Sequence, residues 1–124
     1  MGYRSDVAAL MYSKGGTPEE VAIIREFIRQ RVTPELMKYF DFDGWGAVFE
    51  VEQWKWYESY ADIQMLEKLF DEYQEAFCGG HGVDYDCKYA YEFIRVGESY
   101  DDIETHEAGA EQGRLSVDRF IRIE

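Results

Sequence analysis

Apolar residues recur along the chain at two different spacings, which predict a mixture of helices and strands. The most regular stretch is 61–77, where apolar positions repeat every three or four residues, as in an amphipathic helix. Thr17-Pro18 and Thr33-Pro34 each place a capping residue directly before a proline, so we expect helices to begin there. The second of these helices is expected to be short and to end near Phe40.

Four strands are expected from the remaining apolar positions. The stretch 2–13 contains a nearly continuous apolar run, whereas 45–57 and 86–97 alternate apolar with polar or aromatic residues. In the second strand the alternation slips after Gln53, which predicts a β-bulge or an exposed strand end. The last strand fills the C-terminus, from about 115 to 123.

The expected order of elements is therefore β-α-α-β-α-β-β in one domain over residues 1–124. The simplest packing is an α+β fold, with a four-stranded, mainly antiparallel sheet and two to three helices on one face. The strand order stays open at this point.

Charge is distributed unevenly along the chain, which has a formal net charge of −13. Residues 1–40 hold six bases and five acids, whereas residues 41–124 hold seven bases and 21 acids. Such a surface repels nucleic acid and anionic lipid, and it attracts basic surfaces. Solubility alone is the simpler explanation of the same excess.

The compartment is inferred from what the chain lacks. No window approaches the roughly 18 apolar residues of a membrane span, and residues 1–6 do not form the apolar run of a signal peptide. Two cysteines without an export signal favour free thiols in a reducing compartment. We therefore expect a cytoplasmic protein that does not associate with membranes.

Metal and catalytic chemistry have weak support. Cys78, His81 and Cys87 have the spacing C-x2-H-x5-C, but structural zinc sites usually show two paired ligand sets. A fourth ligand would come from His106, Asp84 or Asp86. Since no nucleophile stands in a recognisable arrangement with a histidine, we expect a protein that is not an enzyme and needs no cofactor. A metal-assisted enzyme or a zinc-stabilised module is the weaker alternative.

The predicted helix over 61–77 carries an acidic stripe. Glu67, Asp71 and Glu75 follow one another at intervals of four residues, so they share one face with a rise of about 6 Å per step. Like charges at this spacing slightly destabilise a helix. A protein that mimics nucleic-acid phosphates would accept that cost, and a merely soluble helix also tolerates it.

Two further groups are candidates for contact with a partner. Trp54, Trp56 and Tyr57 belong to the densest aromatic cluster, of which we expect part to be core and part to be exposed as an anchor. The stretch 98–113 holds six acids and no base, and we expect it to be a long connection that becomes ordered on binding. Its candidate contact residues are Glu98, Asp101, Asp102, Ile103 and Glu104.

Three short runs carry a family resemblance: Gly2-Tyr3-Arg4-Ser5, Trp56-Tyr57-Glu58-Ser59-Tyr60-Ala61-Asp62 and Phe93-Ile94-Arg95-Val96-Gly97-Glu98. The chain resembles a family of small, largely uncharacterised early proteins of tailed bacteriophages. The family offers no catalytic residues to transfer. The resemblance implies a phage context, in which small accessory proteins commonly bind, redirect or inhibit host proteins, including those of defence systems.

The leading hypothesis is therefore an accessory protein that binds and inhibits or redirects a bacterial host protein, including a defence-system protein, by protein–protein contact. Its partner would present a basic surface, and the protein would bind neither nucleic acid nor membrane directly. The alternative is a DNA mimic that blocks a nucleic-acid-binding site. Homodimer formation stays open.

Overall fold

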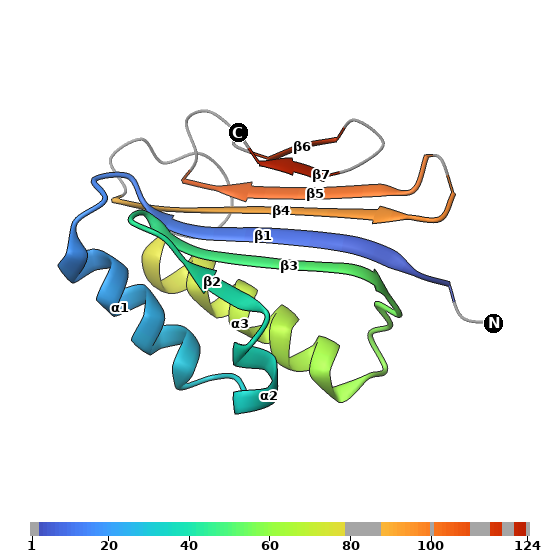
Figure 1. Cartoon of the computed structure of the whole chain (residues 1–124), viewed down its shortest axis with the longest axis horizontal. Helices are drawn as coiled ribbons and strands as arrows, with labels where there is room; N and C mark the ends of the chain where they lie inside the picture. The colour runs from blue at the N-terminus through green and yellow to red at the C-terminus, as the bar shows by residue number, and fades with distance from the viewer. Residues whose placement is uncertain (1–2, 79–87, 100, 110–114, 118–120, 124) are drawn as a thin grey trace.

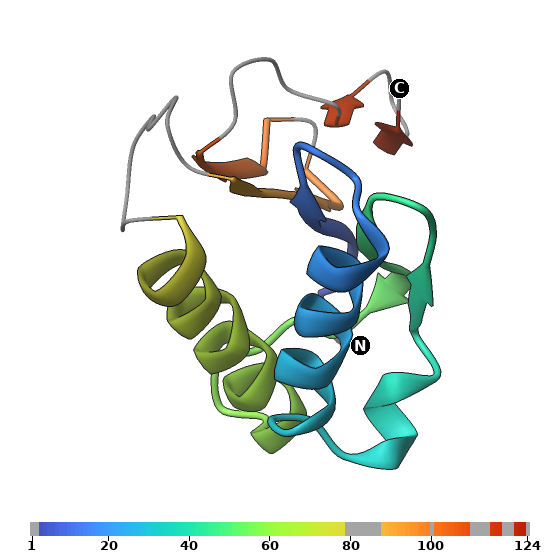
Figure 2. The same ribbon diagram turned by 90° about the vertical axis from the view of Figure 1, so that its left-hand side faces the viewer.

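The computed structural model of the protein describes residues 3–78, 88–99, 101–109, 115–117 and 121–123, with the backbone alone in the last two ranges. Three helices cover one face of an antiparallel sheet, and a short hairpin lies over the opposite face (Figures 1 and 2). In chain order the elements are β1 Ser5–Ser13, α1 Pro18–Arg29, α2 Pro34–Met37, β2 Phe40–Phe42, β3 Gly46–Trp54, α3 Ala61–Phe77, β4 Tyr89–Gly97, β5 Ile103–Ala108, β6 Leu115–Val117 and β7 Ile121–Ile123.

The expected helices begin where the threonine–proline pairs place them. The Thr17 hydroxyl accepts a hydrogen bond from the Glu20 amide at 3.2 Å and donates one to the Glu20 carboxylate at 2.7 Å. Thr33 caps α2 by accepting a hydrogen bond from the Leu36 amide at 3.4 Å. α2 ends at Met37, so the expectation that this helix reaches Phe40 is wrong, because Phe40 begins the edge strand β2.

The helix predicted over 61–77 is confirmed with those bounds as α3. Its apolar side packs against the sheet and against α1, where Phe27 meets Tyr73 and Phe77 in edge-to-face ring contacts. The polar side therefore faces away from the sheet or toward its edge. This orientation brings the acidic residues of α3 close to β4 and β5.

The main sheet has five strands in the order β2-β3-β1-β4-β5, and every neighbouring pair is antiparallel. The α+β class, the antiparallel sheet and the helices on one face are confirmed, but the expected number of four strands is wrong. The sequence pattern missed β2 and β5, which are the two edge strands. The expected C-terminal strand is a separate two-stranded hairpin, β6–β7.

The largest correction concerns the stretch 98–113, which was expected to be a long acidic connection. Residues 103–108 form β5, which pairs with β4, so the connection between these strands spans only 98–102. The Gly97 amide donates to the Asp102 carbonyl at 2.8 Å, and the Asp102 amide donates to the Ser99 carbonyl at 3.0 Å. Residues 101–108 therefore belong to a hairpin turn and a strand rather than to a long connection.

The predicted irregularity after Gln53 is confirmed as a β-bulge. Ser5 pairs with Trp54 and Val7 pairs with Val51, so β3 carries one more residue than β1 between these pairs. Gln53 has a φ of 58°, and its amide donates to the Asp6 carboxylate at 2.9 Å. The bulge ends regular pairing at the place where the aromatic cluster begins.

Both faces of the central strand β1 are buried. Val7, Ala9 and Met11 face the helices, whereas Leu10 and Tyr12 face the opposite side, where β6 and β7 approach the sheet (Figure 2). This second covered face explains why the apolar run in β1 is continuous rather than alternating. None of the helices in the described part of the chain is long and apolar enough to cross a membrane.

Candidate functional site

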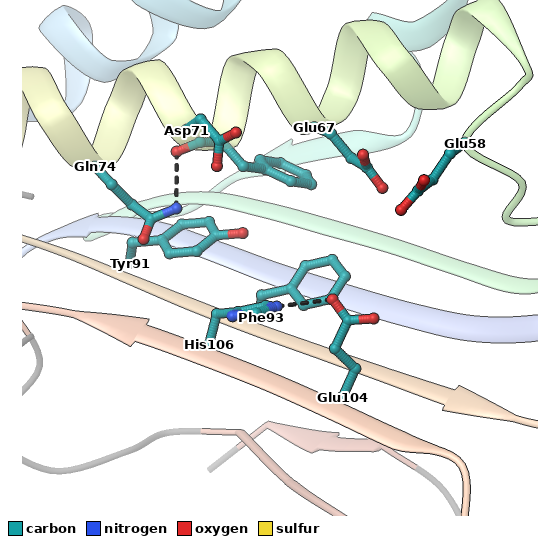
Figure 3. A pocket seen from close by; sticks show the side chains of 9 residues that line it. Glu58, Glu67, Asp71, Gln74, Tyr91, Phe93, Glu104 and His106 are labelled. Carbon is teal, nitrogen blue, oxygen red and sulfur yellow. Dashed lines mark hydrogen bonds and ion pairs between the residues drawn. The ribbon is translucent and has the colours of Figure 1, made fainter. Parts of the chain in front are cut away.

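A pocket of about 200 Å³ opens between α3 and the β4–β5 edge of the sheet. Figure 3 shows Glu67 from α3 and Glu104 from β5 pointing toward the same space. Four carboxylates line the pocket: Glu58, Glu67, Asp71 and Glu104. The other lining residues are Phe70, Gln74, Tyr91, Phe93 and His106. None of these nine residues is a lysine or an arginine, so the pocket is strongly acidic.

The helical wall of the pocket follows from residue spacing in α3. Glu67, Asp71 and Gln74 are separated by four and three positions, which places them on one side of the helix. Phe70 lies between them and is 3% exposed, so it fills the base of this wall. The acidic stripe therefore borders the buried apolar side of α3 rather than standing opposite it.

The sheet wall follows from strand register. Phe93 of β4 pairs with His106 of β5, and their ring centroids lie 5.5 Å apart. Side chains alternate between the two faces of a strand, so Glu104 and His106 share the helix-facing side with Tyr91 and Phe93. Ile103 lies on the other side, which faces away from α3.

Glu67 is the pocket carboxylate whose pKa is raised. Burial raises its pKa above the ordinary value, and the nearby charges of Glu58 and Glu104 raise it further. A hydrogen bond from Trp56 acts in the opposite direction but does not cancel the increase. Glu67 therefore holds its proton more tightly than an exposed glutamate does.

Glu104 has the opposite balance. Burial alone would raise its pKa, but hydrogen bonds with His106 and Arg95 outweigh that effect, and the net shift is downward. The distances are 2.7 Å from His106 Nε2 to Glu104 Oε2 and 3.2 Å from Arg95 Nε to Glu104 Oε1. Glu104 is thus a partly compensated anion at the rim of the pocket.

Two neutral polar groups lie deeper. Tyr91 is 2% exposed, and burial, followed by the charges of Asp71 and Glu104, raises its pKa well above the ordinary range, so its hydroxyl stays protonated. The Gln74 side chain is 4% exposed and extends from α3 toward Tyr91 (Figure 3). Its amide nitrogen donates to the Phe70 carbonyl at 3.2 Å, whereas Oε1 has no hydrogen-bond partner among the described residues.

The structure brings together three of the predicted contact residues, Glu67, Asp71 and Glu104, although they come from two separate candidate groups. Glu75 is exposed on α3 and does not line the pocket. The expected stripe of Glu67, Asp71 and Glu75 therefore contributes two of its three carboxylates to one site.

The remaining candidates of the acidic stretch have other surroundings. Asp102 accepts hydrogen bonds from Tyr3 and Arg95, and the Glu98 carboxylate accepts one from the Arg4 amide at 2.9 Å. Asp101 is exposed in the turn. Ile103 is 46% exposed and pairs with Val96 at the start of β5. These residues were expected to lie on a long connection, but they belong to the β4–β5 hairpin.

The aromatic candidates are all half-buried, as the mixed alternation suggested. Trp56 packs against Phe49 and Phe93, which places it beneath the pocket and next to Glu67. Trp54 instead packs against Tyr39 at a centroid distance of 4.7 Å, on the α2 side of the molecule. The Tyr57 hydroxyl accepts a hydrogen bond from the Tyr3 amide. Of these three aromatic residues, only Trp56 lies next to the acidic site, and it does not line the pocket itself.

Sequence reasoning missed Glu58, Gln74, Tyr91, Phe93 and His106 as members of the site. His106 was placed in a connection, because the stretch Ile103–Ala108 is mostly polar and does not show the apolar–polar alternation of a strand. Tyr91 and Phe93 lie at alternate positions of the strand expected over 86–97, so they share one face. The sequence pattern did not show the neighbouring strand β5, which completes the pocket.

The arrangement offers hydrogen-bond acceptors and negative charge within an aromatic enclosure, which suits a positively charged group. Opposite pKa shifts of two carboxylates also occur in acid–base catalysts.

In the described part of the chain, no three histidine, cysteine, aspartate or glutamate side chains are arranged to hold a metal ion. The zinc alternative involving Cys78, His81 and Cys87 falls largely outside the described residues, which include only Cys78 of the three.

No protein-family model, curated protein or solved structure shows a significant match to the chain. The site is therefore interpreted from its own geometry and charge.

Proposed function

We propose that the protein is a binding protein whose acidic pocket receives a positively charged part of another protein. The observation that carries this proposal is the pocket between α3 and β5, where the lining residues that the structure describes include four carboxylates and no lysine or arginine. Bringing such charges together disfavours their ionisation, as the raised pKa of Glu67 indicates. A cation supplied by a partner would relieve this repulsion and would therefore gain binding free energy.

The biological setting of the proposal rests on the resemblance to small early proteins of tailed bacteriophages. In that setting the partner is a bacterial host protein with a basic surface, including proteins of defence systems, and binding inhibits or redirects it. The acidic charge of the chain supports this choice of partner, since it favours encounter with basic surfaces and disfavours nucleic acid and anionic membranes.

The geometry favours this proposal over the narrower DNA-mimic hypothesis. A phosphate mimic needs ionised carboxylates displayed on an open surface. Glu67 is half-buried and faces into the pocket, and its pKa is raised, so it is a poor substitute for a phosphate. Glu75, which was expected to extend the stripe, lies outside the site.

The experiment compares capture of a host protein from bacterial lysate by wild-type protein and by two triple variants. The site variant neutralises three pocket carboxylates, as Glu58→Gln, Glu67→Gln and Asp71→Asn. The control variant neutralises three exposed carboxylates that do not line the pocket, as Glu19→Gln, Glu50→Gln and Glu52→Gln. Both variants change the net charge equally, so a difference between them reports the pocket rather than general attraction.

We expect the same host protein on the wild type and the control, and loss of about ten-fold or more in affinity with the site variant, since each charged contact contributes on the order of 1 kcal/mol. Raising the salt concentration should weaken capture by the wild type. Equal capture by all three proteins, with folding intact by circular dichroism, would contradict the proposal.

A further inference from the structure

We propose that the pocket between α3 and the β4–β5 edge accepts a single guanidinium group, and that it selects an arginine side chain of the partner over a lysine. This inference rests on the proposed function and adds the chemical identity of the group that is bound. It combines the acidic lining of the pocket with a second feature, the buried carbonyl oxygen of Gln74, which has no hydrogen-bond partner among the residues that the structure describes.

Size limits the occupant. The pocket has a volume of about 200 Å³, below the range of about 300–1,000 Å³ that is typical for sites of drug-sized ligands. It is large enough for the end of one side chain and too small for a folded segment. One inserted side chain from a partner protein is therefore the occupant that fits.

The inner walls are aromatic. Phe70 lies 5.6 Å from Tyr91 and 5.9 Å from Phe93, measured between ring centroids, so the three rings form a continuous apolar lining. A guanidinium group is planar and weakly hydrated, and it stacks on aromatic rings while its edge donates hydrogen bonds. An ammonium group is compact and strongly hydrated, so it gains less from such walls.

The acceptors also match a guanidinium group, which carries five N–H donors in one plane. Asp71 and Glu67 offer carboxylate oxygens at the helical wall, and the Gln74 side chain, which also lines the pocket, ends beside Tyr91 (Figure 3). A buried acceptor without a donor is costly, which gives a ligand that supplies a donor an additional gain. Rotation of the Gln74 amide would break the hydrogen bond from its Nε2 to the Phe70 carbonyl, so the donor of the ligand has to reach Oε1 where it lies.

The test uses N-acetyl-arginine methylamide and N-acetyl-lysine methylamide as probes, each titrated into the full-length protein and followed by NMR. We expect saturable shifts of the backbone amides around Asp71, Gln74 and Phe93, with the arginine probe binding several-fold more tightly. Asp71→Asn should weaken binding of both probes, because it removes a charge that either cation uses.

Gln74→Leu is the decisive variant, since it removes the acceptor while keeping a similar volume. It should weaken arginine binding by roughly ten-fold, the factor expected for one lost hydrogen bond to a charged group, and should leave lysine binding nearly unchanged. Its Tm should equal or exceed that of the wild type, because a buried acceptor without a partner is removed. Gln30→Leu, at an exposed position outside the pocket, should change neither binding nor selectivity.

Two outcomes would overturn the inference. Equal affinity for both probes would show a general cation site, and the absence of saturable shifts with either probe would show that no guanidinium group binds. In both cases the capture experiment can still succeed with its pocket dependence intact, so failure of this inference is distinguishable from failure of the proposed function.

Discussion

Two acidic regions lie next to one another along β5, and they differ in how their charges are compensated. At the β4–β5 turn, Asp102 accepts hydrogen bonds from Arg95 Nη2 at 2.9 Å and from the Tyr3 hydroxyl at 2.6 Å. In the pocket, Glu67 and Asp71 face other carboxylates and no lysine or arginine among the lining residues. Glu104 stands between the two regions, since it contacts Arg95 and also lines the pocket.

The pKa directions express this difference. Arg95 and Tyr3 lower the pKa of Asp102, whereas burial and neighbouring carboxylates raise the pKa of Glu67. The first carboxylate stabilises the folded state as an anion, and the second is destabilised as an anion. A count of acidic residues would treat the turn and the pocket as equal. Only the pocket holds negative charge that no neighbouring base neutralises among its described lining residues, so only the pocket offers such charge to a partner.

Removal of Arg95 should have the largest effect on the turn region. Its side chain is 17% exposed and connects Ser5, Asp102 and Glu104. Arg95→Ala should lower the free energy of unfolding by about 2 kcal/mol, as expected for loss of a few charge-assisted hydrogen bonds. Chemical denaturation followed by circular dichroism measures this change.

Arg29→Ala is the matched control, because Arg29 pairs with Glu26 on the exposed surface of α1. Its stability should stay within experimental error of the wild type. Similar losses in the two variants would remove the distinction between the compensated turn and an ordinary surface ion pair.

Asp102→Asn should have a smaller effect that depends on pH. The folded-state pKa of Asp102 is lowered, so its ionised form contributes stability above its ordinary pKa of about 3.8, and this stability is lost as the pH falls through the folded-state value. The variant should therefore melt below the wild type at pH 7, and the difference should shrink as the pH falls below 3.8 and through the lower folded-state pKa. Asp101→Asn, at the exposed neighbouring position, should match the wild type throughout this pH range.

Glu67→Gln should have the smallest effect and the opposite sign. The folded-state pKa of Glu67 is raised, so the folded protein binds the carboxyl proton of Glu67 more tightly than the unfolded chain does. The contribution of Glu67 to the stability of the fold is therefore lost as the pH rises above its ordinary pKa of about 4.5. The variant should melt slightly above the wild type at pH 7 and at the same temperature near pH 3.5. A thermal melt that shows a lower Tm at pH 7 would contradict the assignment, and Glu75→Gln serves as the exposed control on the same helix.

Local signals predicted much of the fold, because they depend on neighbours in sequence. Capping by Thr17 and the apolar repeat in α3 each act within a few residues, and both were confirmed. The slip after Gln53 also identified a local bulge. The strand β5 was missed because its side chains are exposed at a sheet edge, where the acids carry no apolar alternation and also discourage pairing with another chain.

The sequence by itself determined the α+β class, the acidic character, the three helix starts and the shared face of Glu67 and Asp71 on α3. Only the tertiary structure decided that Glu104 and His106 complete a pocket with that face, since this depends on the register between β4 and β5. It also decided that Arg95 compensates Asp102, to which it is joined across the β4–β5 turn, rather than the carboxylates of α3. Charge compensation depends on distances of a few ångströms between chain segments, and such distances are fixed by packing and strand pairing rather than by composition.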